Sequence, residues 1–305
     1  MRNGLKWMSV LTSAGMFFVL LAGALVTKTE SGAGCGNDWP LCNGKFIPAY
    51  TLESFIEYSH RAITGIVGLL VLFTAIWVWR RYAKGNKARL YAGGALFFTV
   101  LQAVLGAMAV IWDQSSAVMA LHFGFSLLAF SSTLLLAIAV FEGEATQGTA
   151  ETGGLPKISK AFRQYVWFVT AFTYFVVYIG AFVRHTESGG GCIGWPLCNG
   201  EVIPSLSGIA GIAFGHRVAA FVLLCLIIRM TCVVYRSYSM IPELRRSALA
   251  VLIFVIAQVA SGALVVFSKG ADAYIFASML HTVIIAGLFG VLCYSSIRVW
   301  ELYRN

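Results

Sequence analysis

Four of the five histidines in the chain form two matched pairs. His60 and His216 each precede an arginine, in the runs SHRAITGIV and GHRVAAFVL, whereas His122 and His281 stand in the apolar runs ALHFGFSLLAF and MLHTVIIAGLF. Two imidazoles from facing helices of a four-helix bundle are what axial ligation of a haem iron requires. The sequence therefore predicts two bis-histidine haem sites, one built from His60 and His122 and the other from His216 and His281.

The composition places these histidines in a membrane. Of 305 residues, 59% are apolar and only 11% are charged, and the mean hydropathy is +0.80. Such values exclude an ordinary water-soluble domain. A helix needs about 20 apolar residues to cross a hydrocarbon core of about 30 Å, and eight such runs predict an all-α integral membrane protein. The runs are Leu11–Val26, Ala62–Trp79, Leu90–Ile111, Val118–Phe141, Val166–Val183, Ile212–Tyr235, Leu249–Phe267 and Tyr274–Ile297.

The second half of the chain repeats the first. LAGALVTKTESGAGCG aligns with YIGAFVRHTESGGGCIG, and QAVLGAMAV from Gln102 aligns with QVASGALVV from Gln258, at an offset of 156 or 157 residues. Because an even number of helices is duplicated, both halves enter the membrane in the same direction. We expect two pseudo-symmetric four-helix bundles, over residues 1–145 and 164–305, joined by a polar, Gly-rich linker over residues 146–163.

Lysine and arginine residues gather in alternate loops and at both ends of the chain, which is typical of cytoplasmic segments. One short loop holds Arg80, Arg81, Lys84, Lys87 and Arg89. This pattern predicts cytoplasmic termini, a cytoplasmic linker and outer cysteine loops. Topology and contact with anionic lipid account for the net charge of +9, so no nucleic-acid partner is needed.

Each half carries one Gly-rich loop bracketed by two cysteines, SGAGCGNDWPLCNG from Ser31 and SGGGCIGWPLCNG from Ser188. Outside the membrane thiols are oxidised, and the Gly and Pro residues of each loop allow a turn tight enough to join the sulfurs. We expect disulfides between Cys35 and Cys42 and between Cys192 and Cys198.

The histidines also have a plainer interpretation. A single histidine inside a membrane is often a hydrogen-bonding residue between helices. Four histidines at similar depth, paired by the repeat, favour haem ligation instead. Zinc or copper is the weaker alternative, because no set of thiolates or carboxylates completes a tetrahedral site in both halves.

The eight spans in two repeats, the paired histidines, and the loops of the form ESGxGC followed by WPLCNG resemble the haem A synthase family, of the bacterial type with two cysteine pairs. The likeness covers nearly the whole chain. It implies that haem O is the substrate and that its C8 methyl group is oxidised to a formyl group by successive hydroxylations. It also implies a multi-pass protein of the bacterial plasma membrane. His216 and His281 would hold a permanent haem b, and His60 and His122 would hold the substrate haem.

One acid distinguishes the halves: Glu57 lies three residues before His60, whereas the matching residue is Ala213. Residues three apart share a helix face, so a Glu57 carboxylate near His60 is suited to take a proton or to stabilise positive charge on the reacting porphyrin. The family resemblance also implies a functional glutamate here; the alternative is an acid at headgroup level. Arg61 and Arg217 are candidates for propionate contacts or for contacts with lipid phosphates.

The resemblance further implies haem O synthase and cytochrome oxidase assembly factors as partners, with a quinone or another acceptor for the electrons. Two other functions stay open at this point. A di-haem electron-transfer cytochrome would need equivalent bundles and leaves the difference between Glu57 and Ala213 unexplained. A membrane thiol–disulfide oxidase would use the loop cysteines, which predicts labile disulfides and no haem.

Overall fold

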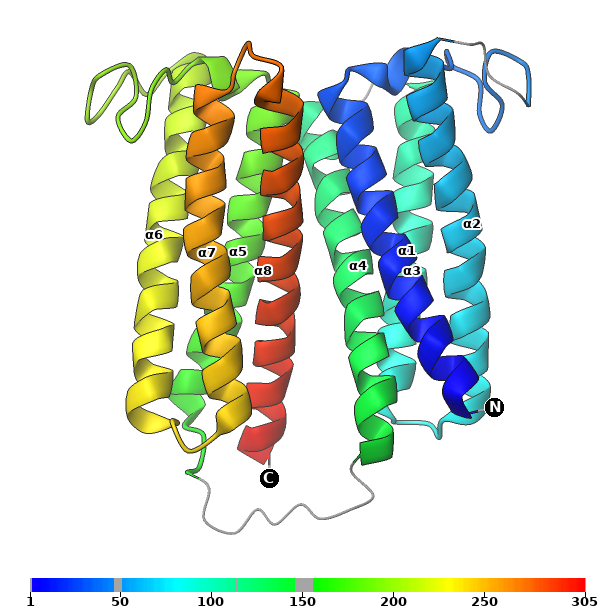
Figure 1. The fold of residues 1–305 in the computed structure, drawn as a ribbon, viewed down its shortest axis with the longest axis vertical. Helices are drawn as coiled ribbons and strands as arrows, with labels where there is room; N and C mark the ends of the chain where they lie inside the picture. Colours follow the sequence, from blue (N-terminus) through cyan, green and yellow to red (C-terminus); the bar gives the residue numbers. More distant parts are fainter. Residues whose placement is uncertain (1, 47–50, 113–114, 146–155, 305) are drawn as a thin grey trace. The chain divides into compact units, whose positions relative to one another are not determined.

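The computed structural model describes residues 2–46, 51–112, 115–145 and 156–304, and within them the chain is helical (Figure 1). Eight long helices alternate with loops, and two of these loops contain a short 3-10 turn. The elements are α1 (Arg2–Lys28), η1 (Ser31–Ala33), α2 (Leu52–Arg81), α3 (Lys87–Ile111), α4 (Ser116–Ala145), α5 (Lys160–His185), η2 (Ser188–Gly190), α6 (Gly208–Ser237), α7 (Pro242–Phe267) and α8 (Ala273–Arg304).

All eight helices are long and apolar enough to cross a membrane, which confirms the predicted all-α class of multi-pass membrane protein. The distribution of side chains on α2 shows how such a helix is arranged. Val71 and Val78 are buried inside the bundle, whereas Ile66 and Phe73 are more than half exposed. Large apolar side chains on the outside suit a lipid solvent, and small ones inside allow the helices to approach closely.

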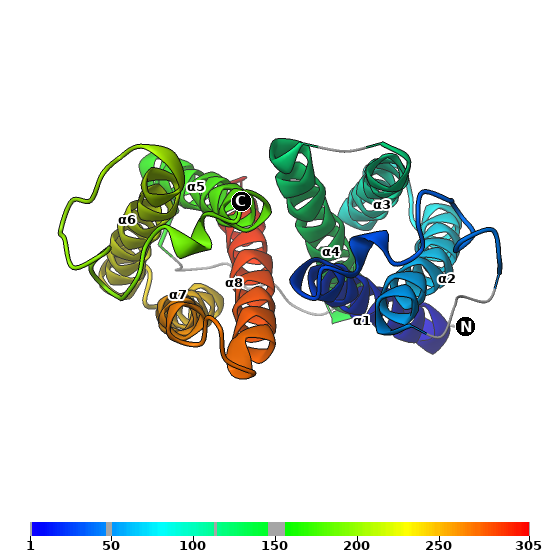
Figure 2. The ribbon, with the colours of Figure 1, turned by 90° about the horizontal axis from the view of Figure 1, so that it is seen from above.

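The chain divides into two compact units, residues 1–150 and 151–305, with the same order of elements in each. In the first unit α1 and α3 each pack against both α2 and α4, and in the second α5 and α7 each pack against both α6 and α8 (Figure 2). Each unit is therefore an antiparallel four-helix bundle in which α2 lies diagonally from α4, or α6 from α8. Residues 146–155, most of the predicted linker, lie outside the described residues.

The helices extend beyond the apolar runs at their ends. Helix α2 begins at Leu52 rather than at Ala62, because Thr51 caps it: its hydroxyl accepts a hydrogen bond from the Ser54 N–H at 3.3 Å. Polar residues thus continue the helix past the hydrocarbon region. Glu57 and His60 consequently lie well inside a regular helix, where their relative directions are fixed by the backbone.

Candidate functional site

Each of the four candidate ligand histidines lies against a glycine of the preceding helix. The glycine has no side chain, so the imidazole can approach the helix backbone closely. The distances from an added Cβ to the histidine Cε1 would be 3.1 Å for Gly23 and His60, 3.4 Å for Gly106 and His122, 2.8 Å for Gly180 and His216, and 3.3 Å for Gly262 and His281. The same arrangement therefore occurs four times, on α1 with α2, α3 with α4, α5 with α6, and α7 with α8.

His60 and His122 project from the diagonal helices α2 and α4 of the first unit. The Nδ1 atoms of His60, His122 and His216 are buried and have no hydrogen-bond partner within the described parts of the chain. A buried nitrogen without a partner is costly and requires an explanation. Buried imidazoles from two helices of one bundle, each packed beside a glycine, form a donor set that fits a haem iron.

His281 is held differently. Its Nδ1 lies 2.9 Å from the Ser261 hydroxyl and its Nε2 lies 2.9 Å from the Gln258 amide nitrogen, both on α7. Among the described residues, it is the only one of the four candidate ligands whose two ring nitrogens both contact side chains at hydrogen-bond distance.

A methyl group added at Gly180 tests whether these glycines position the histidines. We expect Gly180→Ala to displace His216, because the new Cβ would lie 2.8 Å from its Cε1; overpacking of this kind typically costs about 1–3 kcal/mol. The expected result is a clear loss of bis-imidazole haem absorbance per protein. Gly93→Ala is the matched control, since its Cβ would make only an ordinary contact of 3.9 Å with Trp79. Equal haem content in both variants would contradict this role for Gly180.

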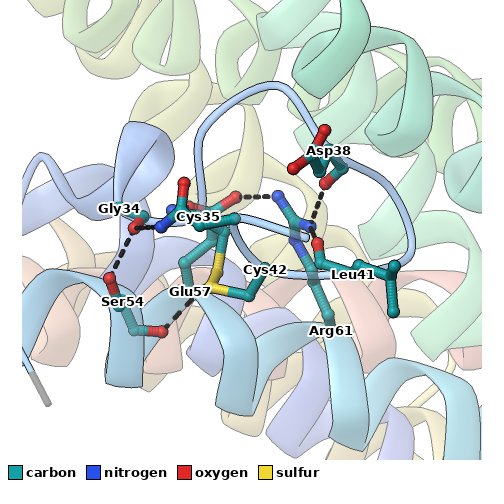
Figure 3. A network of polar contacts seen from close by, with 9 residues as sticks. Gly34, Cys35, Asp38, Leu41, Cys42, Ser54, Glu57 and Arg61 are labelled. Carbon is teal, nitrogen blue, oxygen red and sulfur yellow. Dashed lines mark hydrogen bonds and ion pairs between the residues drawn. A yellow bond between two sulfur atoms is a disulfide. The ribbon is translucent and has the colours of Figure 1, made fainter. Parts of the chain in front are cut away.

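The carboxylate of Glu57 connects α2 to the first cysteine loop (Figure 3). It is 4% exposed; its Oε2 accepts a hydrogen bond from the Cys35 N–H at 2.8 Å, and its Oε1 pairs with Nη2 of Arg61 at 2.5 Å. Both carboxylate oxygens are thus engaged, one by the loop backbone and the other by an arginine. Glu57 therefore lies directly under the Cys35–Cys42 disulfide.

Arg61 holds the same loop through its other terminal nitrogen. Nη1 donates to the carbonyl oxygens of Asp38 and Leu41, at 2.6 Å in both cases. The loop backbone packs closely on α2, since a Cβ at Gly34 would lie only 2.5 Å from the Glu53 carbonyl carbon, and the Ser54 hydroxyl donates to the Gly34 carbonyl at 2.5 Å. The loop is thus fixed to the first turns of the helix that carries His60.

The second unit fixes its loop without an acid. Arg217 donates directly to the carbonyl oxygens of Leu197 and Cys192, at 2.8 and 2.9 Å. At the position that matches Glu57 stands Ala213, which is buried under the loop. Within the described residues, the arginine of the second unit thus binds its loop directly, whereas the first unit places a carboxylate between helix and loop as well.

Both predicted disulfides are confirmed. Cys35 is bonded to Cys42, with a Cα–Cα distance of 4.3 Å, and Cys192 is bonded to Cys198, with a Cα–Cα distance of 4.7 Å. All four cysteines are buried within their loops. Each loop also contains an isolated antiparallel β-bridge that begins at its second cysteine. The bridge joins Cys42 to Lys45 in the first loop and Cys198 to Glu201 in the second.

Comparison with known proteins identifies the family. The family COX15-CtaA, described as "Cytochrome oxidase assembly protein", matches residues 6–54, 49–162 and 163–208. The chain belongs to the COX15-CtaA family.

Among its relatives, the haem A synthase of Bacillus licheniformis is 41% identical over 307 residues, covering 100% of this chain and 99% of the relative. The haem A synthase of Alkalihalophilus pseudofirmus is 39% identical over 300 residues, 98% of each chain. That of Geobacillus kaustophilus is 40% identical over 295 residues, covering 96% of this chain and 91% of the relative.

This COX15-CtaA protein contains site residues that the sequence analysis did not identify. The four glycines beside the histidines were visible in the aligned repeats, where Gly23 matches Gly180 and Gly106 matches Gly262. Ser261 had no comparable signal, because its counterpart is Leu105. The propionate contacts predicted for Arg61 and Arg217 stay a prediction; the contacts observed for both guanidinium groups are with the loops.

Proposed function

We propose that the chain is a haem A synthase, an oxidoreductase that converts haem O to haem A by oxidising the C8 methyl group to a formyl group through successive hydroxylations. The observation that carries this proposal is the 39–41% identity to haem A synthases over almost the full length of both chains. The paired histidines, the disulfide loops and the eight spans support it independently of the relatives.

We assign the substrate haem to the first bundle, with His60 and His122 as its ligands. Support comes from their positions on diagonal helices of one bundle and from their buried Nδ1 atoms, which lack a partner among the described residues. The glycines beside them allow the rings to lie close to the helix backbone. The bundle walls are apolar, which suits a porphyrin and excludes bulk water from the reacting carbon.

Glu57 is the residue to which we assign a catalytic role. Its carboxylate is buried, and contacts with Cys35 and Arg61 hold it at the outer end of α2. An anion held there is suited to accept a proton from the reacting group or to stabilise positive charge on the porphyrin. The loop of the second unit needs no acid, which supports a role for Glu57 beyond holding its loop.

We assign haem b to the second bundle, with His216 and His281 as its ligands. When bound, haem b would supply one-electron transfer from the substrate site towards an external acceptor, such as a quinone. The chain's own contribution is to position the imidazoles, through Gly180 and Gly262, and to cover the site with the Cys192–Cys198 loop. Arg217 fixes that loop to α6 one residue after His216.

The orientation that we propose follows the distribution of lysine and arginine: both termini in the cytoplasm of a bacterium and both disulfide loops outside the plasma membrane. The disulfides agree with an oxidising outer compartment. Haem O synthase and cytochrome oxidase assembly factors are the proposed protein partners, because they would deliver the substrate and use the product. Membrane lipid surrounds the spans.

Extraction of haem from cells tests the function. Expression of this chain together with a haem O synthase, in a host that lacks haem A, is expected to produce haem A on chromatography of the extracted pigments. The empty vector should leave only haem O and haem b. A di-haem cytochrome would show a haem spectrum without new haem A, and a thiol oxidase would show neither; either result would overturn the proposal.

A further inference from the structure

The imidazole of His281 is braced by two side chains of the neighbouring helix. Ser261 and Gln258 contact its two nitrogens at 2.9 Å, whereas the buried Nδ1 atoms of His60, His122 and His216 lack a hydrogen-bond partner among the residues described. Both bracing residues lie on α7, next to Gly262, against which the ring packs. Contact with the glycine sets where the ring lies, and the two hydrogen bonds set how it is turned.

The hydrogen bonds of Ser261 decide which nitrogen of His281 carries the hydrogen. The Ser261 hydroxyl donates its single proton to the Gln258 carbonyl at 3.0 Å. When the hydroxyl makes that bond, its oxygen is left to accept from His281, an arrangement in which Nδ1 is the N–H donor and Nε2 carries the lone pair. The Gln258 amide nitrogen lies 2.9 Å from that Nε2, and it would give way to an iron that binds there. The ring is thus held in the tautomer whose Nε2 can bind an iron.

The first bundle lacks this brace. In the aligned runs QAVLGAMAV and QVASGALVV, Leu105 stands at the position of Ser261. Gln102, which matches Gln258, is directed to the sulfur of Met16, to which it donates at 3.6 Å. His122 packs on Gly106 as His281 packs on Gly262, but leucine offers its Nδ1 no acceptor.

We propose that Ser261 is a positioning residue that makes the second bundle retain its haem, and that leucine at the matching position allows the first bundle to exchange its haem. The inference rests on the proposed function, because a synthase must keep one haem and release the other. Two physical effects support it. A ring already oriented through Nδ1 loses less freedom when it binds iron, and the hydrogen bond makes its Nε2 a stronger donor.

Ser261→Ala in the full-length protein, purified in detergent, tests the brace. We expect haem b to transfer to added apomyoglobin about 10–100-fold faster, the range in which outer partners of metal-binding histidines alter affinity. We also expect a higher midpoint potential, because a weaker donor favours ferric iron less; a tenfold change in the ferric-to-ferrous preference corresponds to about 59 mV. A merely structural role for Ser261 would leave the potential unchanged.

Two further variants keep the test decisive if Ser261→Ala also weakens the fold. Ser247→Ala is the matched control: its buried hydroxyl makes the same kind of bond on α7, to the Leu244 carbonyl at 3.1 Å, but contacts no histidine. It should release haem as the wild type does. Leu105→Ser is the reciprocal variant, and after loading with protohaem its first bundle should release that haem more slowly than the wild type.

The outcomes separate this inference from the proposed function. Wild-type haem release and potential in Ser261→Ala, or unchanged release from the first bundle of Leu105→Ser, would overturn the role of the brace while leaving haem A synthesis untouched. A wild-type protein without any bis-imidazole spectrum would instead overturn the ligand assignment on which both depend.

Discussion

Glu57→Gln is expected to lower haem A formation about 10²–10⁴-fold, the usual contribution of a positioned proton acceptor, while the haem b spectrum stays intact. Glutamine conserves the shape of the side chain and can still accept the hydrogen bond from Cys35, but it carries no charge and takes up no proton at neutral pH. The two carbonyl contacts of Arg61 continue to hold the loop. Chromatography of extracted haems should show that haem O, or a hydroxylated intermediate, accumulates.

Ser54→Ala separates the chemistry of Glu57 from its contacts with the loop. It removes a hydrogen bond between α2 and the same loop, the one to Gly34, without altering the carboxylate. If the charge of Glu57 is what matters, Ser54→Ala should form haem A at close to the wild-type rate. Equal losses in the two variants would assign Glu57 to loop positioning, and wild-type haem A from Glu57→Gln would make it an ordinary acid at headgroup level.

Replacing His216 or His281 by methionine is expected to remove the bis-imidazole spectrum of haem b. Loss of an axial ligand should weaken haem binding by more than the roughly 10–100-fold that an outer partner of a ligand costs. Any haem that stays bound should have a raised potential, as methionine–histidine ligation typically produces. Absorption spectra and pyridine haemochrome assays of purified protein, with haem reported per chain, measure both effects.

The control for this prediction is His185→Met, in the same unit but outside the proposed ligand set, which should keep the wild-type spectrum. His60→Met and His122→Met should stop haem A formation and yet leave haem b in the second bundle. A normal bis-imidazole spectrum in His216→Met or His281→Met would show that other groups bind the iron.

The class of the protein and its disulfides could be predicted without a structure because they depend on local signals. Apolar runs long enough to cross a bilayer predict spanning helices whatever their partners, and the described part of the chain contains eight such helices. Cysteines six or seven positions apart in a Gly-rich loop are joined because the short chain between them limits their separation. The histidine pairs could be recognised by aligning the two halves of the sequence, which requires no knowledge of contacts between helices.

The roles of Arg61 and Glu57 show where such reasoning stops. Their residue types indicated an anion-binding cation and a catalytic acid, but not that each would also bind the loop backbone at Cys35, Asp38 and Leu41. The residue types of a loop do not reveal which of its backbone N–H and C=O groups will be free to bind a side chain. Their availability depends on how the loop folds over the helix.

The amino-acid sequence by itself determined the spanning helices, the disulfide pairing and the matched positions of the histidines. These follow from hydrophobicity, from the short loop between the paired cysteines, and from the internal repeat of the chain. Only the tertiary structure decided that Gly180 lies against His216, that Cys35 binds Glu57, and that Ser261 braces His281. The physical reason is that a contact between helices depends on their mutual rotation and depth. A difference of one residue, a rotation of about 100°, turns a side chain away from its partner.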